Sequence, residues 1–167
     1  MKKLLIAATA AAVLLTACGQ NSQTAAPQTE QTASAAAQAQ SQTERNKANT
    51  LAFYDLAFNQ HQLQQAVDQY IGSEYIQHNP GVADGGQAFI DAFAPFLKEN
   101  PQSRAEVKRV MADGDLVMLH VFSQANPQDQ GEAVVDIFRL DENGKIVEHW
   151  DVIQAMPTEF AHSNGMF

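Results

Sequence analysis

The order of hydrophobic patterns in this sequence predicts an α+β fold, in which three helices precede an antiparallel sheet. Apolar residues recur with helical spacing up to about residue 100 and alternate with polar residues after residue 103. Two glycine-containing turns then join the alternating segments into hairpins. Helices followed by a run of strands are typical of an α+β domain.

The helical part divides into three amphipathic segments. In the first, at residues 44–59, Leu51, Tyr54 and Phe58 lie on one face at spacings of three and four. The second begins near Leu63 and ends at Gly72, a typical helix terminator. The third spans residues 89–97 and is closed by Asn100-Pro101. Between the last two, residues 74–79 are predicted to be extended, and a turn follows at Asn79-Pro80-Gly81.

Four strands are predicted, at residues 104–112, 115–124, 132–140 and 145–154. The last hairpin turns at residues 141–144, where a type I turn with a glycine bulge suits Gly144. This register places Asp136 opposite Trp150, and we favour it. A shift of one residue would place Asp136 opposite His149, on the same face as Asp151.

The N-terminus has the pattern of an export signal. Met1-Lys2-Lys3 is followed by an apolar run from Leu4 to Leu15, which as a helix would span only about 18 Å and is too short to cross a bilayer. Leu15-Thr16-Ala17-Cys18 resembles the bacterial lipoprotein signal, which implies removal of residues 1–17 and lipidation of Cys18. The alternative is an ordinary secretory peptide that leaves a free thiol.

Lipidation would anchor the protein to a membrane through Cys18. Gly19 stands where the inner-membrane retention signal of lipoproteins has Asp, so the resemblance implies the cell envelope, at the outer membrane of a Gram-negative bacterium. Residues 18–45 are rich in Gln, Ala, Ser and Thr, and beyond the cysteine they contain no large apolar side chain. They are predicted to form a disordered tether. The folded domain is then residues 46–167.

Composition excludes several classes of function. The chain has 10 Lys and Arg against 19 Asp and Glu, and a formal net charge of −9, so nucleic acid is not an expected partner. A single cysteine excludes an internal disulfide and a cysteine-based zinc site. The sequence contains no Gly-x-Ser-x-Gly motif and no HxH or HExxH pairing. We therefore expect neither a metal nor another cofactor.

Two polar residues on apolar strands are candidates for chemistry. Asp136 shares a strand face with Val134 and Phe138, where desolvation would raise the pKa of a carboxyl group. The alternative is a structural carboxylate satisfied by hydrogen bonds, or one on an exposed edge. His120 lies among apolar residues on its own strand, where a hydrogen-bonded core histidine is the simpler interpretation.

Three segments together resemble the SnoaL-like proteins of the nuclear-transport-factor-2-like superfamily, over about residues 47–157. They are Tyr75-Ile76-Gln77-His78-Asn79-Pro80 with Gly86 opening a helix, Val135-Asp136-Ile137-Phe138-Arg139-Leu140, and Gly144-Lys145-Ile146-Val147-Glu148-His149-Trp150-Asp151-Val152. The resemblance implies a cone-shaped fold. In it, a curved antiparallel sheet wraps around three N-terminal helices and encloses a pocket for a small apolar ligand.

The resemblance also implies roles for individual residues. The namesake enzymes close a ring by an intramolecular aldol reaction without a metal or cofactor. Their acid/base aspartate matches Asp136, and the histidine of the preceding strand matches His120. His78 is the third predicted catalytic residue. The predicted ligand-binding residues are Tyr54, Tyr75, Trp150 and Asp151.

Two functions stay open at this point. The first is an enzyme that performs acid/base chemistry on a small carbonyl compound. The second is a non-catalytic envelope module that uses the same fold to hold a ligand or dock a partner. Because proteins of this fold often dimerise through the outer face of the sheet, a homodimer through Val135, Ile137 and Val147 is also expected.

Overall fold

A computed structural model describes residues 26–167 and confirms the predicted α+β architecture. The predicted signal peptide and Cys18 lie outside the described residues. The elements are α1 Ala26–Phe58, α2 Leu63–Tyr70, β1 Ile71–Gln77, α3 Gly86–Glu99, β2 Arg104–Asp113, β3 Leu116–Gln124, β4 Glu132–Leu140 and β5 Ile146–Ala155.

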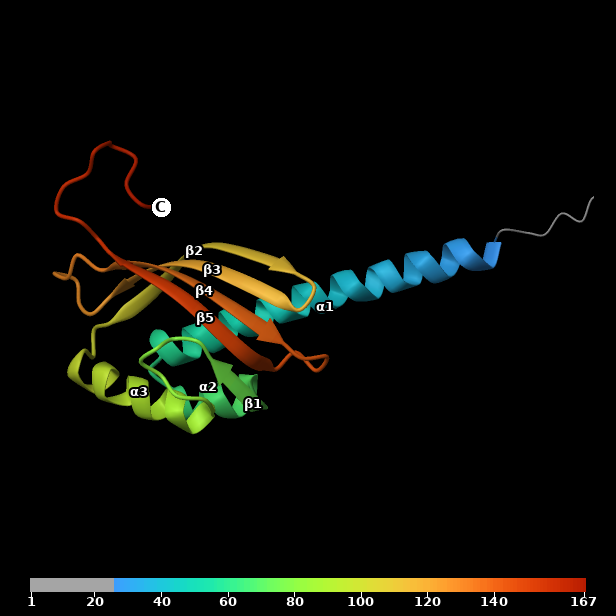
Figure 1. Cartoon of the computed structure of the whole chain (residues 1–167), viewed down its shortest axis with the longest axis horizontal. Helices are drawn as coiled ribbons and strands as arrows, with labels where there is room; N and C mark the ends of the chain where they lie inside the picture. The colour runs from blue at the N-terminus through green and yellow to red at the C-terminus, as the bar shows by residue number, and fades with distance from the viewer. Residues whose placement is uncertain (1–25) are drawn as a thin grey trace, which may run out of the picture.

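The sheet has five strands in the order β1-β5-β4-β3-β2. It is curved and open, and the helices lie along its concave side (Figure 1). Strands β2 to β5 form the predicted antiparallel meander. Strand β1 was not predicted at this length, and it pairs parallel to β5.

Gly72 is the second residue of β1, at a position where the sequence predicts only the end of a helix. Ile71 pairs with Ile146, and Gln77 pairs with His149 at the other end of the strand. A Cβ at position 72 would lie 2.9 Å from Cγ1 of Val147, so the close approach of the two strands requires glycine there.

The core lies between the helices and the concave face of the sheet. Val117, Leu119 and Val121 alternate along β3 and are each 0% exposed. Phe53 of α1 meets Phe138 of β4 edge-on, with ring centroids 6.0 Å apart. Burial of each such side chain contributes about 1.5–3 kcal/mol to folding, and it fixes which strand positions face inward.

A bulge at Val147 changes the predicted register of the last hairpin. Near the turn, Leu140 pairs with Ile146, which is the favoured register. The ladder then skips Val147, so Arg139 pairs with Glu148 and Asp136 lies opposite Asp151. The predicted pairing of Asp136 with Trp150 is therefore wrong, because the extra residue moves Trp150 opposite Ile137.

Helix α1 begins at Ala26, so a disordered tether over the whole of residues 18–45 is not what the structure shows. Residues 31–41 are exposed, and α1 projects away from the domain in Figure 1. Ala and Gln are good helix formers, Pro27 is tolerated in the first turn, and the docked half of α1 supplies a helical end to extend. No helix within residues 26–167 has the length and apolar content needed to cross a membrane.

The C-terminal tail returns to the convex face of the sheet. The ring of Phe167 lies 5.0 Å from His120 and 5.4 Å from Phe122, measured between centroids. Both partners alternate with the buried residues of β3, so they face away from the helices. The end of the tail therefore packs outside the cone.

Candidate functional site

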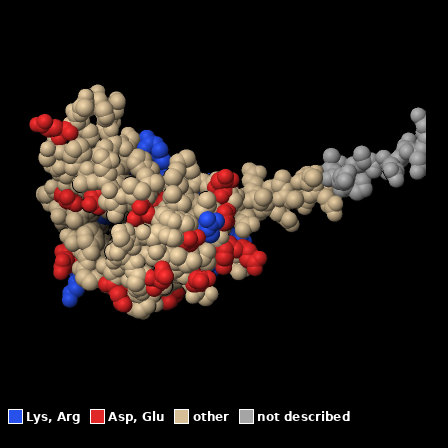
Figure 2. All heavy atoms as spheres, viewed as in Figure 1, with Lys and Arg blue, Asp and Glu red and all other residues tan. Residues whose placement is uncertain are grey.

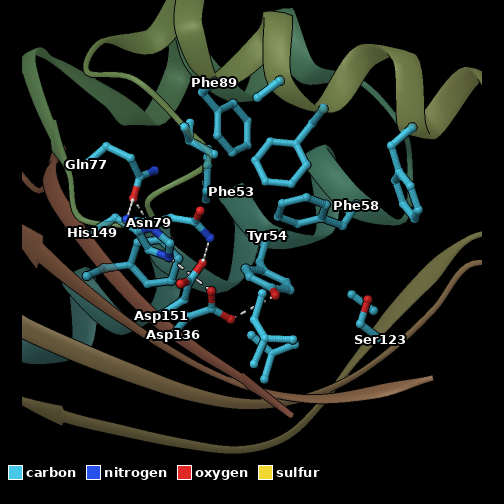
Figure 3. Close-up of a pocket in the computed structure, with 18 of the residues that line it drawn as sticks. Phe53, Tyr54, Phe58, Gln77, Asn79, Phe89, Ser123, Asp136, His149 and Asp151 are labelled. Atoms are coloured by element: carbon cyan, nitrogen blue, oxygen red, sulfur yellow. Dashed lines mark hydrogen bonds and ion pairs between the residues drawn. The ribbon is translucent and has the colours of Figure 1, made fainter. Parts of the chain in front are cut away.

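A cavity of about 320 Å³ lies between the concave face of the sheet and helices α1 and α3. One part of its wall is aromatic and the other is polar (Figure 3). The aromatic part includes Phe53, Phe58, Phe89, Phe93 and Phe96, and the polar part includes Tyr54, Tyr75, Gln77, Asn79, Asp136, His149 and Asp151. An apolar chamber with a few converging polar groups is typical of a small-molecule site.

Asp136 occupies the centre of the polar part. It is 5% exposed, and each of its carboxyl oxygens has a partner. The hydroxyl of Tyr54 donates to Oδ2 at 2.9 Å, while Nε2 of His149 lies 3.0 Å from Oδ1. The pattern of alternation correctly predicts the face and burial of Asp136.

Gln77 determines which nitrogen of His149 carries hydrogen. Its Oε1 accepts backbone N–H bonds from His78 and Asn79, both at 3.0 Å, so this atom is the oxygen of the amide. Nδ1 of His149 lies 2.8 Å from the same oxygen and must therefore donate to it. A neutral ring with its hydrogen on Nδ1 would present only a lone pair at Nε2.

A proton is consequently required between His149 and Asp136. A lone pair on Nε2 facing an ionised carboxylate at 3.0 Å would be repulsive. The pair is satisfied either as imidazolium and carboxylate or as imidazole and carboxylic acid. In both states the two residues hold one proton and have no net charge, which is the arrangement of an acid/base dyad.

Two tyrosines complete the polar wall as hydrogen-bond donors. Burial raises the pKa of Tyr54 well above its ordinary value, and the charge of Asp136 and their hydrogen bond raise it further. Burial also raises the pKa of Tyr75, although a hydrogen bond with Gln77 opposes the shift. The negative field of Asp136 and Asp151 adds to the rise for both tyrosines. Both hydroxyls thus stay protonated at neutral pH.

Asp151 lies opposite Asp136 on the neighbouring strand. Its Oδ2 accepts a hydrogen bond of 2.6 Å from Nδ2 of Asn79, in the loop after β1. The side chain is half-buried and lines the cavity. The structure therefore places Tyr54, Tyr75, Asp136 and Asp151 together, as the sequence predicts.

The same groups are the ones that could hold a metal ion. Ligand atoms of Asp136, His149 and Asp151 lie within 4.8 Å of one another. Nε2 of His149 and Oδ1 of Asp136 lie 3.0 Å apart, at hydrogen-bond length, so these two groups can also partner each other directly. The expectation that no metal or cofactor is needed stays a prediction.

His120 does not belong to this site. It pairs with Val135, while its neighbour Leu119 pairs with Asp136, so His120 and Asp136 face opposite sides of the sheet. Nδ1 of His120 lies 3.2 Å from Nη1 of Arg109 on the convex side. The predicted pairing of Asp136 with His120 is wrong because the two residues occupy opposite faces of paired strands.

His78 and Trp150 also lie outside the cavity. Their rings stack at 4.8 Å with an interplanar angle of 4°, and Nε2 of His78 is 2.9 Å from Glu148. The bulge at Val147 turns Trp150 to the convex face, so it cannot form the predicted wall of the pocket. His78 follows the end of β1 and joins this outer cluster.

Sequence reasoning missed His149 and Gln77 as site residues. His149 was signalled only by the disfavoured register, which places it on the face of Asp151. Gln77 carries no signal of its own, because its importance depends on the parallel pairing of β1 with β5.

The fold and this cavity together define a cone-shaped α+β domain with an internal pocket. The sequence pattern of the SnoaL-like polyketide cyclases matches residues 48–160. This chain therefore belongs to the SnoaL-like polyketide cyclase family. A comparison with curated protein sequences finds no match.

Solved structures with this fold are only distantly similar in sequence. AclR from Streptomyces galilaeus is 24% identical with a TM-score of 0.57, over 67% of this chain and 90% of AclR. A nuclear-transport-factor-2-like protein of unknown function from Mesorhizobium loti is 20% identical with a TM-score of 0.55, over 68% of this chain and 93% of its own. A SnoaL-like protein of unknown function from Burkholderia thailandensis is 15% identical with a TM-score of 0.53, over 65% of this chain and 97% of its own. These similarities establish the fold.

Proposed function

We propose that the domain binds a small, mostly apolar carbonyl compound and moves a proton at the carbon beside the carbonyl group. The observation that carries this proposal is the Asp136–His149 pair, which holds one proton at the polar end of an aromatic cavity. Membership of the SnoaL-like polyketide cyclase family supports it.

The proposed step uses this chain's own residues as acid, base and donor. With the shared proton on His149, the carboxylate of Asp136 takes a proton as the C–H bond breaks. The electron pair moves onto the carbonyl oxygen and forms an enolate. Tyr75 lines the cavity and accepts from Nε2 of Gln77 at 3.3 Å, so its own O–H can donate to that oxygen. Return of the proton, or attack of the enolate on a second carbonyl, completes the reaction.

Hydrogen–deuterium exchange tests the step without knowledge of the natural substrate. A panel of neutral benzo-fused cyclic ketones, including 1-indanone and 2-tetralone, is incubated in D₂O with the domain, and loss of the α-proton signal is followed by NMR. We expect exchange above the buffer rate, and a fall of at least about 100-fold for Asp136→Asn, a typical contribution of one acid/base group. His120→Ala should keep the wild-type rate.

Either of two results would count against this proposal. The first is wild-type exchange equal to that of buffer for ketones that bind. The second is an equal loss of exchange rate in Asp136→Asn and His120→Ala, which would show that the exchange does not take place in the cavity.

We also propose that the domain works in the cell envelope, anchored through a lipidated Cys18. The support is the lipoprotein-like signal Leu15-Thr16-Ala17-Cys18. A Cys18→Ser variant expressed in a Gram-negative host should leave the membrane fraction and lose labelling by a palmitate analogue. Retention of both properties by this variant would refute the anchor.

A non-catalytic docking role is the second candidate, and exposed apolar groups on the convex face favour it. Val152 is 71% exposed and Met111 is 54% exposed, beside the half-buried Val135 and Ile137. Val147 is also half-buried, and its Cγ1 lies close to Gly72. We propose that this face forms a homodimer. Sedimentation at micromolar concentration should then show a dimer that Val152→Asp dissociates, whereas a monomeric wild type would exclude it.

A further inference from the structure

The charge balance of the cavity points to a kind of ligand that its shape alone does not specify. Within residues 26–167, the groups that line it include the carboxylates Glu132, Asp136 and Asp151 and one imidazole, His149, but no Lys or Arg. Acidic side chains also outnumber basic ones on the molecular face seen in Figure 2. Nothing in this wall would favour a ligand carboxylate or phosphate.

Asp151 has a charge that its surroundings do not balance. Asp136 and His149 together hold one proton and so have no net charge as a pair. The hydrogen-bond donor to Asp151 is Asn79, whose amide is neutral. In the described part of the chain no ion pair reaches Asp151, since His78 and Arg139 both bind Glu148 on the convex side.

The field of Asp151 reaches into the cavity. It is one of the charges that raise the pKa values of Tyr54 and Tyr75, whose rings form part of the wall. A half-buried charge beside apolar surface is screened less than one in water. The faces of aromatic rings such as Phe58 and Phe93 are also favourable to cations.

We infer that the occupant of this cavity has a cationic amine that pairs with Asp151, while its apolar body lies against the phenylalanines. This inference rests on the proposed function and adds the substrate class to it. The ligand atoms of Asp136 and Asp151 lie within 4.8 Å of each other. An amine at Asp151 would therefore be only a few bonds from the carbon that gives its proton to Asp136, as in an amino ketone.

Three probes with the same ring and different charge test the inference. They are 2-aminoindane, which is cationic, 1-indanone, which is neutral, and indane-2-carboxylate, which is anionic. Binding is measured by isothermal titration calorimetry at neutral pH with EDTA present, so that divalent ions play no part. We expect the amine to bind about tenfold or more tighter than the ketone, and the carboxylate to bind weakest.

Two matched variants test whether the preference for the amine comes from Asp151 or from the overall negative charge of the chain. Asp151→Asn should lower the affinity for the amine much more than the affinity for the ketone, and so remove most of the preference for the amine. Asp115→Asn removes the same charge from an exposed residue paired with Arg139, remote from the cavity, and should preserve the preference.

The outcomes distinguish this inference from the proposed function. Failure of all three probes to bind would refute a small-molecule pocket and with it both proposals. Binding of the ketone without preference for the amine would overturn the inference alone, as would an equal effect of the Asp151 and Asp115 substitutions. If Asp151→Asn does not fold, the ranking of the three probes on the wild type decides.

Discussion

At the scale of single residues, the site depends on a chain of hydrogen bonds that crosses three elements. Gln77 at the end of β1 fixes the ring of His149 on β5, and His149 faces Asp136 on β4. The backbone N–H groups of His78 and Asn79 fix Gln77 in turn. In the proposed reaction Gln77 is thus a positioning residue, and Asp136 and His149 are the groups that exchange the proton.

Substitution of Asp136 by Asn should separate proton transfer from stability. An asparagine can accept from Tyr54 through Oδ1 and donate to Nε2 of His149 through Nδ2, so every hydrogen bond survives without the shared proton. Urea unfolding should give a stability within about 1 kcal/mol of the wild type, or a gain of that size where the carboxyl was strained. Asp136→Ala should cost about 1–3 kcal/mol because both donors lose their partner.

A larger loss for Asp136→Asn would contradict this prediction and make Asp136 a structural group. Asp115→Asn serves as the reference for an exposed ion pair, whose removal should change stability by less than about 1 kcal/mol.

The tyrosine beside the dyad predicts a dependence of stability on alkaline pH. The folded state raises the pKa of Tyr54, so above about pH 10 the unfolded chain loses this proton while the folded chain keeps it. Stability contributed by the neutral hydroxyl is therefore present below pH 10 and is lost as the pH rises, by about 1.4 kcal/mol per pH unit.

Tyr54→Phe removes this dependence for one of the two buried tyrosines. Urea unfolding at about pH 9 and about pH 11 should show a smaller alkaline loss for the variant than for the wild type. Tyr75 continues to contribute in both proteins. Equal losses in the two proteins would show that Tyr54 ionises as easily in the folded state as in the unfolded chain.

Some of these residue positions could be predicted from sequence and others could not. Alternation along one strand is local, so it correctly places Asp136 on the inward face, and helical spacing does the same for Tyr54 on α1. Asp151 faces inward only because of the bulge at Val147, since the favoured register gave that face to Trp150. The same rule would have excluded His120 had the faces of β3 and β4 been matched to each other. His149 depends on a bulge of one residue, which the sequence of the hairpin does not reveal.

At the scale of elements, helix α1 holds two of the hairpin turns of the sheet through two asparagines. Nδ2 of Asn46 donates to the carbonyl of Gly114 at 3.1 Å, and Nδ2 of Asn49 donates to that of Gly144 at 2.9 Å. Both glycines have positive φ, +59° and +78°. The two positions share this backbone conformation but differ in the space around them, so substitutions at the two can be compared directly.

Gly144→Ala should therefore destabilise the domain more than Gly114→Ala. A Cβ at position 144 would lie 2.7 Å from Nδ2 of Asn49, whereas nothing lies within 4 Å at position 114. The backbone conformation alone should cost about 1 kcal/mol in each variant, and crowding against α1 should add at least about 1 kcal/mol at position 144. Thermal or urea unfolding of the two variants side by side measures this difference. Equal losses of stability in the two variants would mean that α1 can move away from this turn at no measurable cost.

The elements themselves were predictable where their signals are local. Turn residues and hydrophobic period give the three helices and the four-stranded meander. Strand β1 lacked a clear signal, because parallel pairing joins Ile71–Gln77 to residues about seventy positions later in the chain. Gln77 reaches His149 only through this pairing, so the missing strand and the missing site residue have one cause.

At the scale of the whole molecule, the projecting half of α1 is separate from the stability of the domain. Residues 31–41 are exposed, and from residue 31 onward the first buried side chain of α1 is Asn46. A chain that begins at Gln42 should keep its free energy of unfolding within about 0.5 kcal/mol of one that begins at Ala26. Circular dichroism should report less helix in the shorter chain.

A loss of more than about 1 kcal/mol in the shorter chain would show that the projecting segment contacts the domain. The predicted result would fit a spacer that holds the cavity away from an anchoring membrane, as the lipoprotein proposal requires.

The central claim of this account is that His149 and Asp136 share one proton, with Nδ1 of His149 bonded to Gln77. Imidazole ¹⁵N chemical shifts of the domain at neutral pH test it most directly, with His149 assigned by a His149→Gln variant. We predict that Nδ1 carries hydrogen in the wild type, that Nε2 is partly or fully protonated, and that Asp136→Asn converts the ring to the neutral Nδ1–H form. A neutral ring with its hydrogen on Nε2, unchanged by Asp136→Asn, would contradict the dyad.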